Sequence, residues 1–415
     1  MLHAGCWILA VLSSKNHYGT QRMNKVVSVP AVFRKTRDTF AAGTKTLPQR
    51  YFVSTEIFRQ EQEQIFSTQW LLVGHQSQIA DAGDYFLVST PPSFDYRAAG
   101  ESLIITRDKN GAIHGFYNVC RHRGTRLKED ACGHASAIQC PYHAWTYGLD
   151  GRLIGAPHMD EVPGFDKADY SLRAVNLALW EGFVFINLDE NAMPLEEWFA
   201  PLNGKFSHWN MPILRPAKRI EYDVRANWKL MFENYSECYH CPGVHPMLAK
   251  VSPYDSAQND LSEGPFLGGF MKINKGAGLT MSGKACALPV GGIKRADEEE
   301  ADDDGLVFYY SIFPNMLLSL HPEYVMVHQL WPMSPERTLI VCDWFFHPDA
   351  FNRPDFKPDD AFEFWDMTNK QDWHVCELSQ QGIASRAYQP GPYSSRESIP
   401  AAWDRYYLRV MNAEK

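Results

Sequence analysis

The stretches CRHRGTRL at residues 120–127 and CPYHAWTYGLDG at residues 140–151 decide how the first half of the chain folds. Each stretch supplies one cysteine and one histidine, and two thiolates with two imidazoles make a closed metal site. A tetrahedral zinc ion is one possible occupant. Zinc fingers of this composition place cysteine beside cysteine and histidine beside histidine, whereas a two-iron cluster with different ligands on its two irons requires the mixed arrangement. The candidate ligands are Cys120, His122, Cys140 and His143.

Short alternating patterns surround these two stretches and predict a small antiparallel β domain. The expected strands are Tyr85–Ser89, Ser102–Arg107, Ile113–Val119 and Phe183–Asn187. Turn residues separate them, notably the segments at 108–111 (DKNG) and 150–151 (DG). A helix is expected before this domain, over Ser54–Phe66, with Ser54 or Thr55 as its N-cap.

A second group of candidate metal ligands follows a Pro-rich hinge at residues 211–216, in the segment NWKLMFENYSECYHCPGVHP at 227–246. Residues three apart share a helix face, so the Glu237 carboxylate is expected beside the His240 ring. The pair Pro242–Gly243 should end the helix and bring His245 back towards His240. Two histidines at a helix break next to a carboxylate favour a metal site over a structural role.

The third ligand is expected from a helix over residues 359–381 that ends at Gly382. Apolar residues recur there at three- and four-residue intervals and place Asp372 on the inward face. A buried carboxylate needs a partner, and an arginine is the ordinary one. The alternative is an iron ion, because two histidines and one carboxylate form the facial triad that leaves positions open for O2 and substrate.

Together these motifs resemble those of Rieske-type non-haem iron oxygenases, over roughly residues 47–411. C-x-H followed by C-x2-H is similar to the motif of the Rieske [2Fe-2S] cluster. The resemblance implies that Cys120 and Cys140 bind one iron and that His122 and His143 bind the other. Histidine in place of cysteine raises the potential of such a cluster, which acts as a one-electron relay.

The later motif, E-x2-H-x4-H followed by Q-D-x4-E at residues 371–377, is similar to the catalytic domain of Rieske oxygenase large subunits. It implies His240, His245 and Asp372 as Fe(II) ligands and Glu237 as a carboxylate that carries electrons between subunits. Many ring-hydroxylating dioxygenases have Asp at the Glu237 position and one more residue between the Glu-Asn pair (residues 233–234 here) and the first histidine. The form ENYxECYHC is closer to the branch that acts on quaternary amines, which includes choline, glycine betaine, carnitine and stachydrine oxygenases.

The resemblance implies an α+β fold with two domains. An antiparallel β-sandwich Rieske domain is expected over residues 71–190, and a helix-grip (START-like) catalytic domain over 191–415, with a curved antiparallel sheet around a long helix. Residues 46–70 are expected to form an N-terminal helix that packs on the catalytic domain. Residues 1–45 are expected to be an N-terminal extension, disordered in part.

The implied function is that of a terminal oxygenase that hydroxylates a small molecule with O2, by N-demethylation or C-hydroxylation of a quaternary ammonium compound. An aromatic-ring or aromatic-acid oxygenase is the alternative within the enzyme class, and a non-catalytic zinc-binding protein the alternative outside it. A homotrimer is implied, with electrons crossing from the cluster of one subunit to Glu237 of its neighbour. No G-x-G-x-x-G fingerprint is present, so a separate ferredoxin or flavin reductase is expected to oxidise NAD(P)H.

Aromatic residues in the expected strands of the catalytic domain could line a pocket for an onium ion, which binds well to aromatic faces. These candidates are Tyr309, Tyr310, Phe313, Tyr324 and Trp331. Further strands are expected at Leu306–Phe313, Tyr324–Leu330 and Thr338–Phe346.

The composition argues against some classes of binding partner. The chain has 40 basic and 49 acidic residues, a net charge of -9 and no basic run, which argues against nucleic acid. No apolar stretch reaches the roughly 18 residues that span a bilayer, so a soluble, cytoplasmic protein is expected. The nine cysteines are odd in number and several lie beside histidines, which indicates metal ligation in a reducing compartment rather than disulfides. The acidic segment 297–304 is expected to be a solvated loop.

Overall fold

The computed structural model describes residues 31–90, 100–287, 289–290 and 305–412. Within them the chain forms two compact units, one from residues 67–195 and the other from residues 31–66 and 196–412. Most of the expected N-terminal extension, residues 1–30, and the acidic segment 297–304 lie outside the described residues. None of the described helices is both long and apolar enough to cross a membrane.

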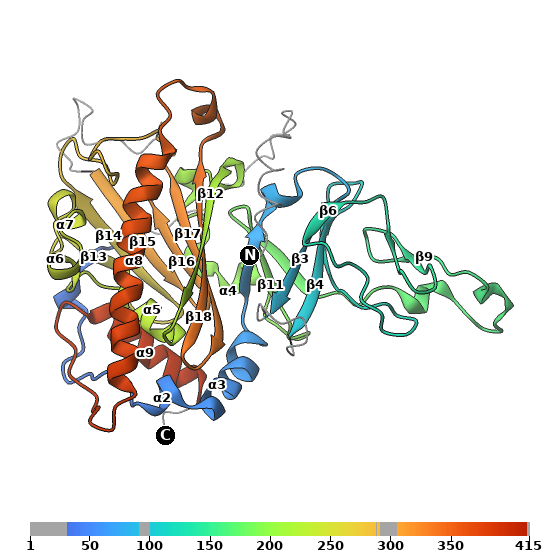
Figure 1. Ribbon diagram of the computed structural model, residues 1–415, viewed down its shortest axis with the longest axis horizontal. Coiled ribbons are helices and arrows are strands. Elements are labelled where there is room, and N and C mark those ends of the chain that lie inside the picture. The colour runs from blue at the N-terminus through green and yellow to red at the C-terminus, as the bar shows by residue number, and fades with distance from the viewer. Residues whose placement is uncertain (1–30, 91–99, 288, 291–304, 413–415) are drawn as a thin grey trace. The chain divides into compact units, whose positions relative to one another are not determined.

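The first unit is built from three antiparallel sheets. One has the order β5-β4-β3-β6, the second β10-β11-β2, and the third β7-β8-β9 (Figure 1). The strands are β2 (Leu71–His75), β3 (Asp84–Thr90), β4 (Glu101–Arg107), β5 (Ile113–Tyr117), β6 (Cys132–His134), β7 (Ile138–Gln139), β8 (Thr146–Tyr147), β9 (Leu153–Gly155), β10 (Asn176–Trp180) and β11 (Phe183–Asn187). The four strands expected in this region are therefore all present, within one or two residues at their ends.

Turn chemistry fixes the hairpin between β4 and β5. Asp108 Oδ1 accepts hydrogen bonds from the backbone amides of Asn110 (2.8 Å) and Ala112 (2.9 Å). Gly111 has φ of 86°, a left-handed conformation that glycine adopts at little cost. The side chain of Asp108 thus replaces ladder hydrogen bonds at the turn and sets the register of the two strands that lead to the first cysteine loop.

The second unit is an eight-stranded antiparallel sheet with the order β1-β13-β14-β15-β16-β17-β18-β12. Figure 1 shows the long helix α8 (Pro358–Ile383) lying along this sheet. The strands are β1 (Arg34–Lys35), β12 (Arg215–Val224), β13 (Gln258–Leu261), β14 (Phe266–Ile273), β15 (Gly305–Ile312), β16 (Met316–Leu320), β17 (Val325–Ser334) and β18 (Arg337–Phe346). The expected α+β fold, with a sandwich-like β unit and a sheet with a long helix, is confirmed.

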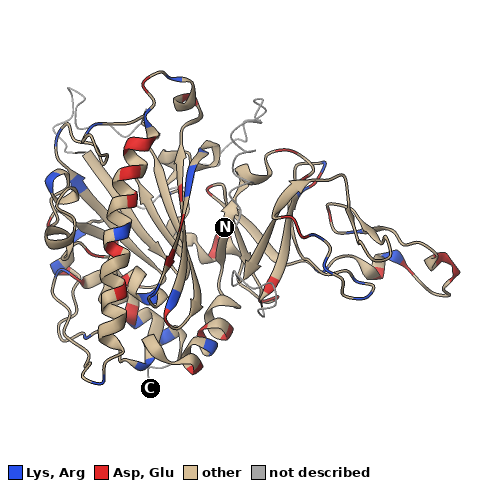
Figure 2. Ribbon diagram, viewed as in Figure 1, with Lys and Arg blue, Asp and Glu red and all other residues tan. Residues whose placement is uncertain are grey.

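Helix α8 differs from its prediction at one end. Gly382 was expected to end the helix, but the helix continues through it to Ile383. A glycine ends a helix when it takes a left-handed φ, and Gly382 is not among the glycines with positive φ. Acidic residues recur along α8 (Figure 2), and Asp372 is the one among them that lies next to two histidines.

A buried ion pair connects the N-terminal segment of the second unit to the rest of that unit. It contains α2 (Arg50–Val53), α3 (Thr55–Glu61) and a π-helical turn at Gln62–Phe66, and the Ser54 hydroxyl caps α3 as expected. Glu61 accepts hydrogen bonds from Lys229 Nζ (2.5 Å) and from Tyr407 Oη (2.6 Å). Both charged groups are at most 1% exposed. Lys229 belongs to α5 (Trp228–Tyr235), the helix that leads into the second metal-ligand motif.

Candidate metal centres

The two cysteine loops of the first unit have the same backbone design. In the first, the Cys120 amide donates to Thr125 O (2.8 Å) and Cys120 O accepts from the Gly124 amide (3.0 Å). In the second, the Cys140 amide donates to Trp145 O (2.8 Å) and Cys140 O accepts from the Ala144 amide (3.1 Å). The residue four positions after each cysteine has positive φ, 76° at Gly124 and 55° at Ala144. Each loop therefore presents its cysteine and its histidine from one tight turn.

The cysteines and the histidines of these loops differ in exposure. Cys120 and Cys140 are each 2% exposed and are free thiols, whereas His122 and His143 are exposed. The two histidine rings lie 4.8 Å apart between centroids, and His122 stacks on Trp145. Partial desolvation of its ring, together with the nearby His143 and Arg123, lowers the pKa of His122, which favours the neutral form that a metal ligand needs.

Tyr147 is a partner of the first loop that sequence reasoning missed. Its hydroxyl lies 3.3 Å from Cys120 Sγ and accepts a hydrogen bond from the Arg121 amide (3.0 Å). The residue is fully buried. The tyrosine in TYG could have suggested this role, because hydrogen bonds to ligand sulfurs tune iron–sulfur clusters.

The segment that carries Glu237 and His240 is a turn and not a helix, which corrects the prediction. Helix α5 ends at Tyr235, before both residues. Glu237 Oε2 accepts from the amides of Tyr239 and His240, so its side chain caps a new turn in competition with the helix. Pro242 and Gly243 lie in a single helical turn, α6 (Cys241–Val244), directly before His245.

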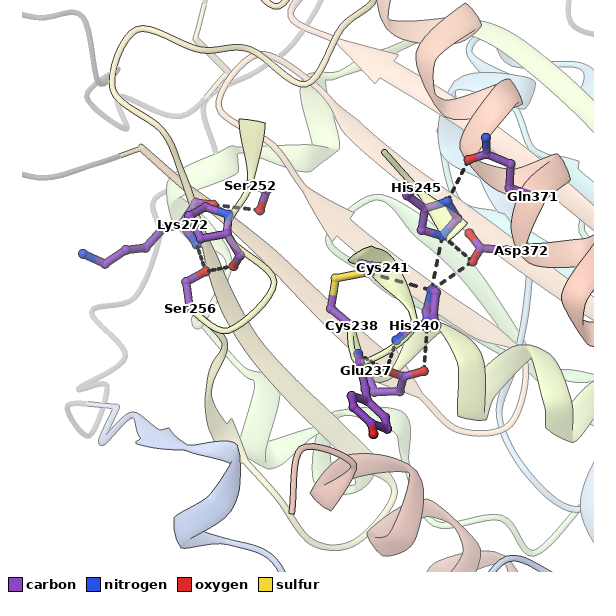
Figure 3. Close-up of a disulfide and its surroundings, with 12 residues drawn as sticks. Glu237, Cys238, His240, Cys241, His245, Ser252, Ser256, Lys272, Gln371 and Asp372 are labelled. Atoms are coloured by element: carbon purple, nitrogen blue, oxygen red, sulfur yellow. Dashed lines mark hydrogen bonds and ion pairs between the residues drawn. A yellow bond between two sulfur atoms is a disulfide. The ribbon is translucent and has the colours of Figure 1, made fainter. Parts of the chain in front are cut away.

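His240, His245 and Asp372 meet at one point in the second unit (Figure 3). Ligand atoms of the three residues all lie within 4.8 Å of one another, an arrangement that can hold a metal ion. Asp372 Oδ1 lies 2.9 Å from His245 Nε2 and 3.2 Å from His240 Nε2. The structure thus brings together three side chains that lie up to 132 positions apart in the sequence, from His240 to Asp372.

Each histidine of this group is oriented by a hydrogen bond on the opposite side of its ring. His240 Nδ1 donates to Glu237 Oε1 (2.5 Å), and His245 Nδ1 donates to Gln371 Oε1 (2.8 Å). With the protons on Nδ1, both Nε2 lone pairs point at the common centre, the tautomer that metal ligation needs. The sequence motif assigns no contact to Gln371, and the structure gives its side chain this one.

The electrostatics of the group favour a bound cation. Burial lowers the pKa of His240, but hydrogen bonds and charges from Asp372 and Glu237 outweigh it and raise the pKa to about 10. For Asp372, burial raises the pKa, yet the two histidines lower it overall. Without a metal the site therefore retains a proton among its ligands, in the place that a divalent cation would take.

Two parts of this chain match known protein families. Residues 69–166 match the Rieske [2Fe-2S] domain family, and residues 213–413 match the catalytic domain of ring-hydroxylating α subunits. The carnitine monooxygenase oxygenase subunit of Acinetobacter pittii is 37% identical over 350 residues, which cover 83% of this chain and 86% of the relative. The chain belongs to the Rieske-type oxygenases. The glycine betaine monooxygenase oxygenase subunit of Chromohalobacter salexigens is 30% identical over 387 residues, covering 85% of this chain and 82% of that one.

A solved structure of a quaternary ammonium Rieske monooxygenase has the same fold, with a TM-score of 0.73 and 27% identity, and covers 89% of this chain and 96% of its own. Membership of the family means that this oxygenase uses a Rieske [2Fe-2S] cluster, a mononuclear iron and O2. As an oxygenase subunit it works with a separate reductase and a small-molecule substrate.

A cavity of about 610 Å³ opens beside the triad of the oxygenase. His240, His245 and Asp372 line it, and so do aromatic and sulfur-containing side chains. Among the described residues that line this cavity there is no lysine or arginine. The aromatic lining consists of Tyr235, Tyr309, Trp365 and Trp373, and the methionines are Met271 and Met326.

Of the five aromatic residues expected in the pocket, Tyr309 lines this cavity and the other four do not. Tyr310 points to the other face of β15, where its hydroxyl donates to Asp260 (3.0 Å). Tyr324 is fully buried, donates to Leu279 O (2.9 Å) and accepts from Trp365 Nε1 (2.6 Å). Phe313 packs against Trp403, Trp228 and Tyr406, and Trp331 is 4% exposed in the sheet.

The cysteines of the second unit also depart from expectation. Cys238 and Cys241 form a disulfide, so the prediction that the cysteines form no disulfides is wrong at this pair. Both side chains line the cavity beside the triad. Cys342 and Cys376 are free thiols, and both of them and Cys286 are buried.

Proposed function

We propose that this oxygenase hydroxylates a small quaternary ammonium compound at the mononuclear iron. The observation that carries the proposal is the lining of the cavity beside the triad, which offers aromatic faces and, among the described residues, no cationic side chain. A quaternary ammonium group has no N–H to donate and is held by the electron-rich faces of aromatic rings. The named activities of the relatives, on carnitine and on glycine betaine, support the same substrate class.

Four aromatic rings are suited to hold the cationic end of the substrate. Tyr235 and Tyr309 pack edge to face, with ring centroids 5.9 Å apart, and the Tyr235 hydroxyl is engaged with Ser319 Oγ (2.9 Å). Trp365 is fixed by its hydrogen bond to Tyr324. Rings held in this way lose little conformational entropy when a ligand binds, which favours affinity.

His328 is the polar group of the cavity that suits the other end of the substrate. It is 1% exposed, and neither ring nitrogen makes a hydrogen bond of good geometry to any described residue. Burial lowers its pKa to about 4, although Asn369 and Asp372 oppose this effect, so the ring is neutral. A neutral imidazole can donate to a hydroxyl or carboxylate oxygen without repelling an ammonium group.

We assign the mononuclear iron to His240, His245 and Asp372, and the cluster to Cys120, Cys140, His122 and His143. The iron supplies the site for O2 activation, and the triad leaves coordination positions open for it. Glu237 orients His240 and, on this proposal, links it electronically to the cluster of a neighbouring subunit in a homotrimer. The exposed edge formed by His122 and His143 supports an exit for electrons towards a second subunit.

The experiment that tests the substrate class is O2 uptake by the purified oxygenase with a partner reductase and NADH. Glycine betaine, carnitine and choline are compared with benzoate and naphthalene. We expect uptake coupled to product only with quaternary amines, with formaldehyde released if an N-methyl carbon is hydroxylated. Coupled turnover of the aromatic compounds alone would reject the proposal.

A further inference from the structure

The disulfide between Cys238 and Cys241 closes a short loop that contains His240, one of the proposed iron ligands. His240 lies between the two cysteines in sequence, and the Cα atoms of the cysteines are 5.0 Å apart. Figure 3 shows the two sulfur atoms beside His240, with Cys241 Sγ 3.9 Å from His240 Nε2. That nitrogen is the one that faces the common centre of the triad. The pair thus lies beside the point where the three ligand side chains would hold a metal ion.

Access to the pair is restricted to small molecules. Cys238 is 9% exposed and Cys241 is 3% exposed, and both line the same cavity as the triad. A protein disulfide reductase cannot reach sulfurs buried to this degree. A small oxidant or a small thiol can reach them through the cavity. Cys342 and Cys376, the buried free thiols among the described residues of this unit, do not line the cavity.

We propose that Cys238 and Cys241 are a reversible dithiol–disulfide centre that consumes hydrogen peroxide formed at the iron cavity. When O2 takes up two electrons and two protons without hydroxylating a substrate, hydrogen peroxide is the product. One cysteine sulfur attacks the peroxide, forming a sulfenic acid and releasing water. The second sulfur displaces the hydroxyl, which leaves as a second water, and the S–S bond forms. Two thiols and one peroxide thus give one disulfide and two waters.

Oxidation of the pair does not dismantle the metal site. In the disulfide form, His240, His245 and Asp372 still lie within 4.8 Å of one another, and Glu237 still accepts from His240 Nδ1. The centre is therefore a protective device and not an off-switch. It removes peroxide before the peroxide attacks the iron ligands and the aromatic lining. The proposal does not depend on which substrate the oxygenase hydroxylates.

The first test uses the wild-type holoenzyme and peptide mapping. The enzyme is reduced with dithiothreitol, freed of it under argon, treated with hydrogen peroxide, alkylated with iodoacetamide and digested with trypsin. The peptide of residues 230–250 contains both cysteines and no others, and residues 371–386 contain Cys376 as an internal control. Burial raises the pKa of the Cys376 thiol, which makes it a poor nucleophile.

With iodoacetamide added in denaturant, so that every remaining thiol is accessible, we expect peroxide to remove both alkylatable thiols from peptide 230–250 and to link them, while Cys376 is still alkylated. A second dithiothreitol treatment should restore both thiols. Thiols of Cys238 and Cys241 that remain alkylated after peroxide would overturn the proposal. A disulfide that resists dithiothreitol in the native enzyme would also overturn it, because the bond would then be a permanent cross-link.

The second test compares Cys238→Ser and Cys241→Ser with Cys376→Ser as the matched control. Each cavity variant should retain a sulfenic acid on its remaining cysteine, detected with dimedone, and should lose mononuclear iron faster than the control under the same peroxide. Equal rates of iron loss in all three variants would contradict the protective role.

Discussion

His240 and His245 present their Nε2 atoms to each other at 3.2 Å. Both rings carry their proton on Nδ1, where Glu237 and Gln371 accept it. Two nitrogen lone pairs at this distance repel each other unless a positive charge lies between them. A proton or a divalent metal satisfies the arrangement, and Asp372 adds a negative charge at the same point. The fold therefore holds these side chains in a geometry that only a bound cation makes favourable.

The first prediction concerns Asp372. Replacement by Ala removes one of three ligands, so the iron content of the purified enzyme should fall from about three to about two atoms per chain. The Rieske absorption should persist, because the cluster loops belong to the other unit. Metal analysis together with the visible spectrum checks both expectations. Full iron content and turnover in this variant would require another third ligand, with Asp366 and Glu377 as the next candidates.

The second prediction is that iron affinity rises with pH. The pKa of His240, raised to about 10 in the metal-free site, lies above that of an unfolded histidine. Its pairing with the carboxylates thus stabilises the metal-free protein fully at acidic pH and is lost as the pH rises through about 10. Iron must displace this proton, so the affinity should rise about tenfold per pH unit across neutral pH. Anaerobic competition with a chelator at several pH values measures the iron affinity. An affinity that does not change with pH would show that iron displaces no proton.

The third prediction concerns the hydroxyl of Tyr147 next to Cys120 Sγ. Tyr147→Phe keeps the ring and removes the hydrogen bond to sulfur, so negative charge on the cluster is less well stabilised and the reduction potential should fall. Direct electrochemistry of the variant measures the shift. The control is Tyr142→Phe, because Tyr142 is 56% exposed and lies on the other loop. Equal reduction potentials in the wild type and Tyr147→Phe would show that the hydroxyl does not tune the cluster.

The sequence predicted these strands and ligands because alternation and motif spacing are local signals. What it could not supply depends on three-dimensional context. Tyr309 and Tyr310 are adjacent in β15, and only the register of the sheet decides that Tyr309 faces the cavity. Glu237 was placed on a helix because its spacing to His240 fits one, whereas the capping bonds of its carboxylate end the helical pattern earlier. The Cys238–Cys241 pair requires a turn that brings the Cα atoms to 5.0 Å, which the spacing alone does not establish.

The fourth prediction concerns the buried pair of Lys229 and Glu61. Lys229→Met leaves the Glu61 carboxylate buried without its cation, and this should destabilise the second unit by about 3–5 kcal/mol. The exposed pair of Arg337 and Asp223 is the control, since Asp223→Ala should cost about 1 kcal/mol or less. Thermal unfolding followed by circular dichroism compares the variants. Adding Glu61→Gln to Lys229→Met should recover part of the loss, and no recovery would show that packing, not charge, dominates.

The last prediction concerns Glu237, which we assign to electron transfer and not to iron binding. Its Oε1 accepts from His240 Nδ1, on the side of the ring opposite the metal-facing Nε2. Glu237→Gln keeps the size and one acceptor oxygen but removes the charge, so both iron and cluster should stay bound. Turnover should fall by about ten- to a hundredfold, the range for altered hydrogen-bond partners of metal ligands.

Single-turnover kinetics distinguish this role from a structural one. In Glu237→Gln the reductase should still reduce the cluster at the wild-type rate, and reoxidation with substrate and O2 should be slow. Gln371→Glu is the matched comparison, because it alters the partner of His245 and leaves the Glu237 contact intact. Its reoxidation should be less affected than that of Glu237→Gln if the electron enters through His240. Rapid reoxidation in Glu237→Gln would exclude the bridge, and loss of iron from that variant would instead make Glu237 a ligand.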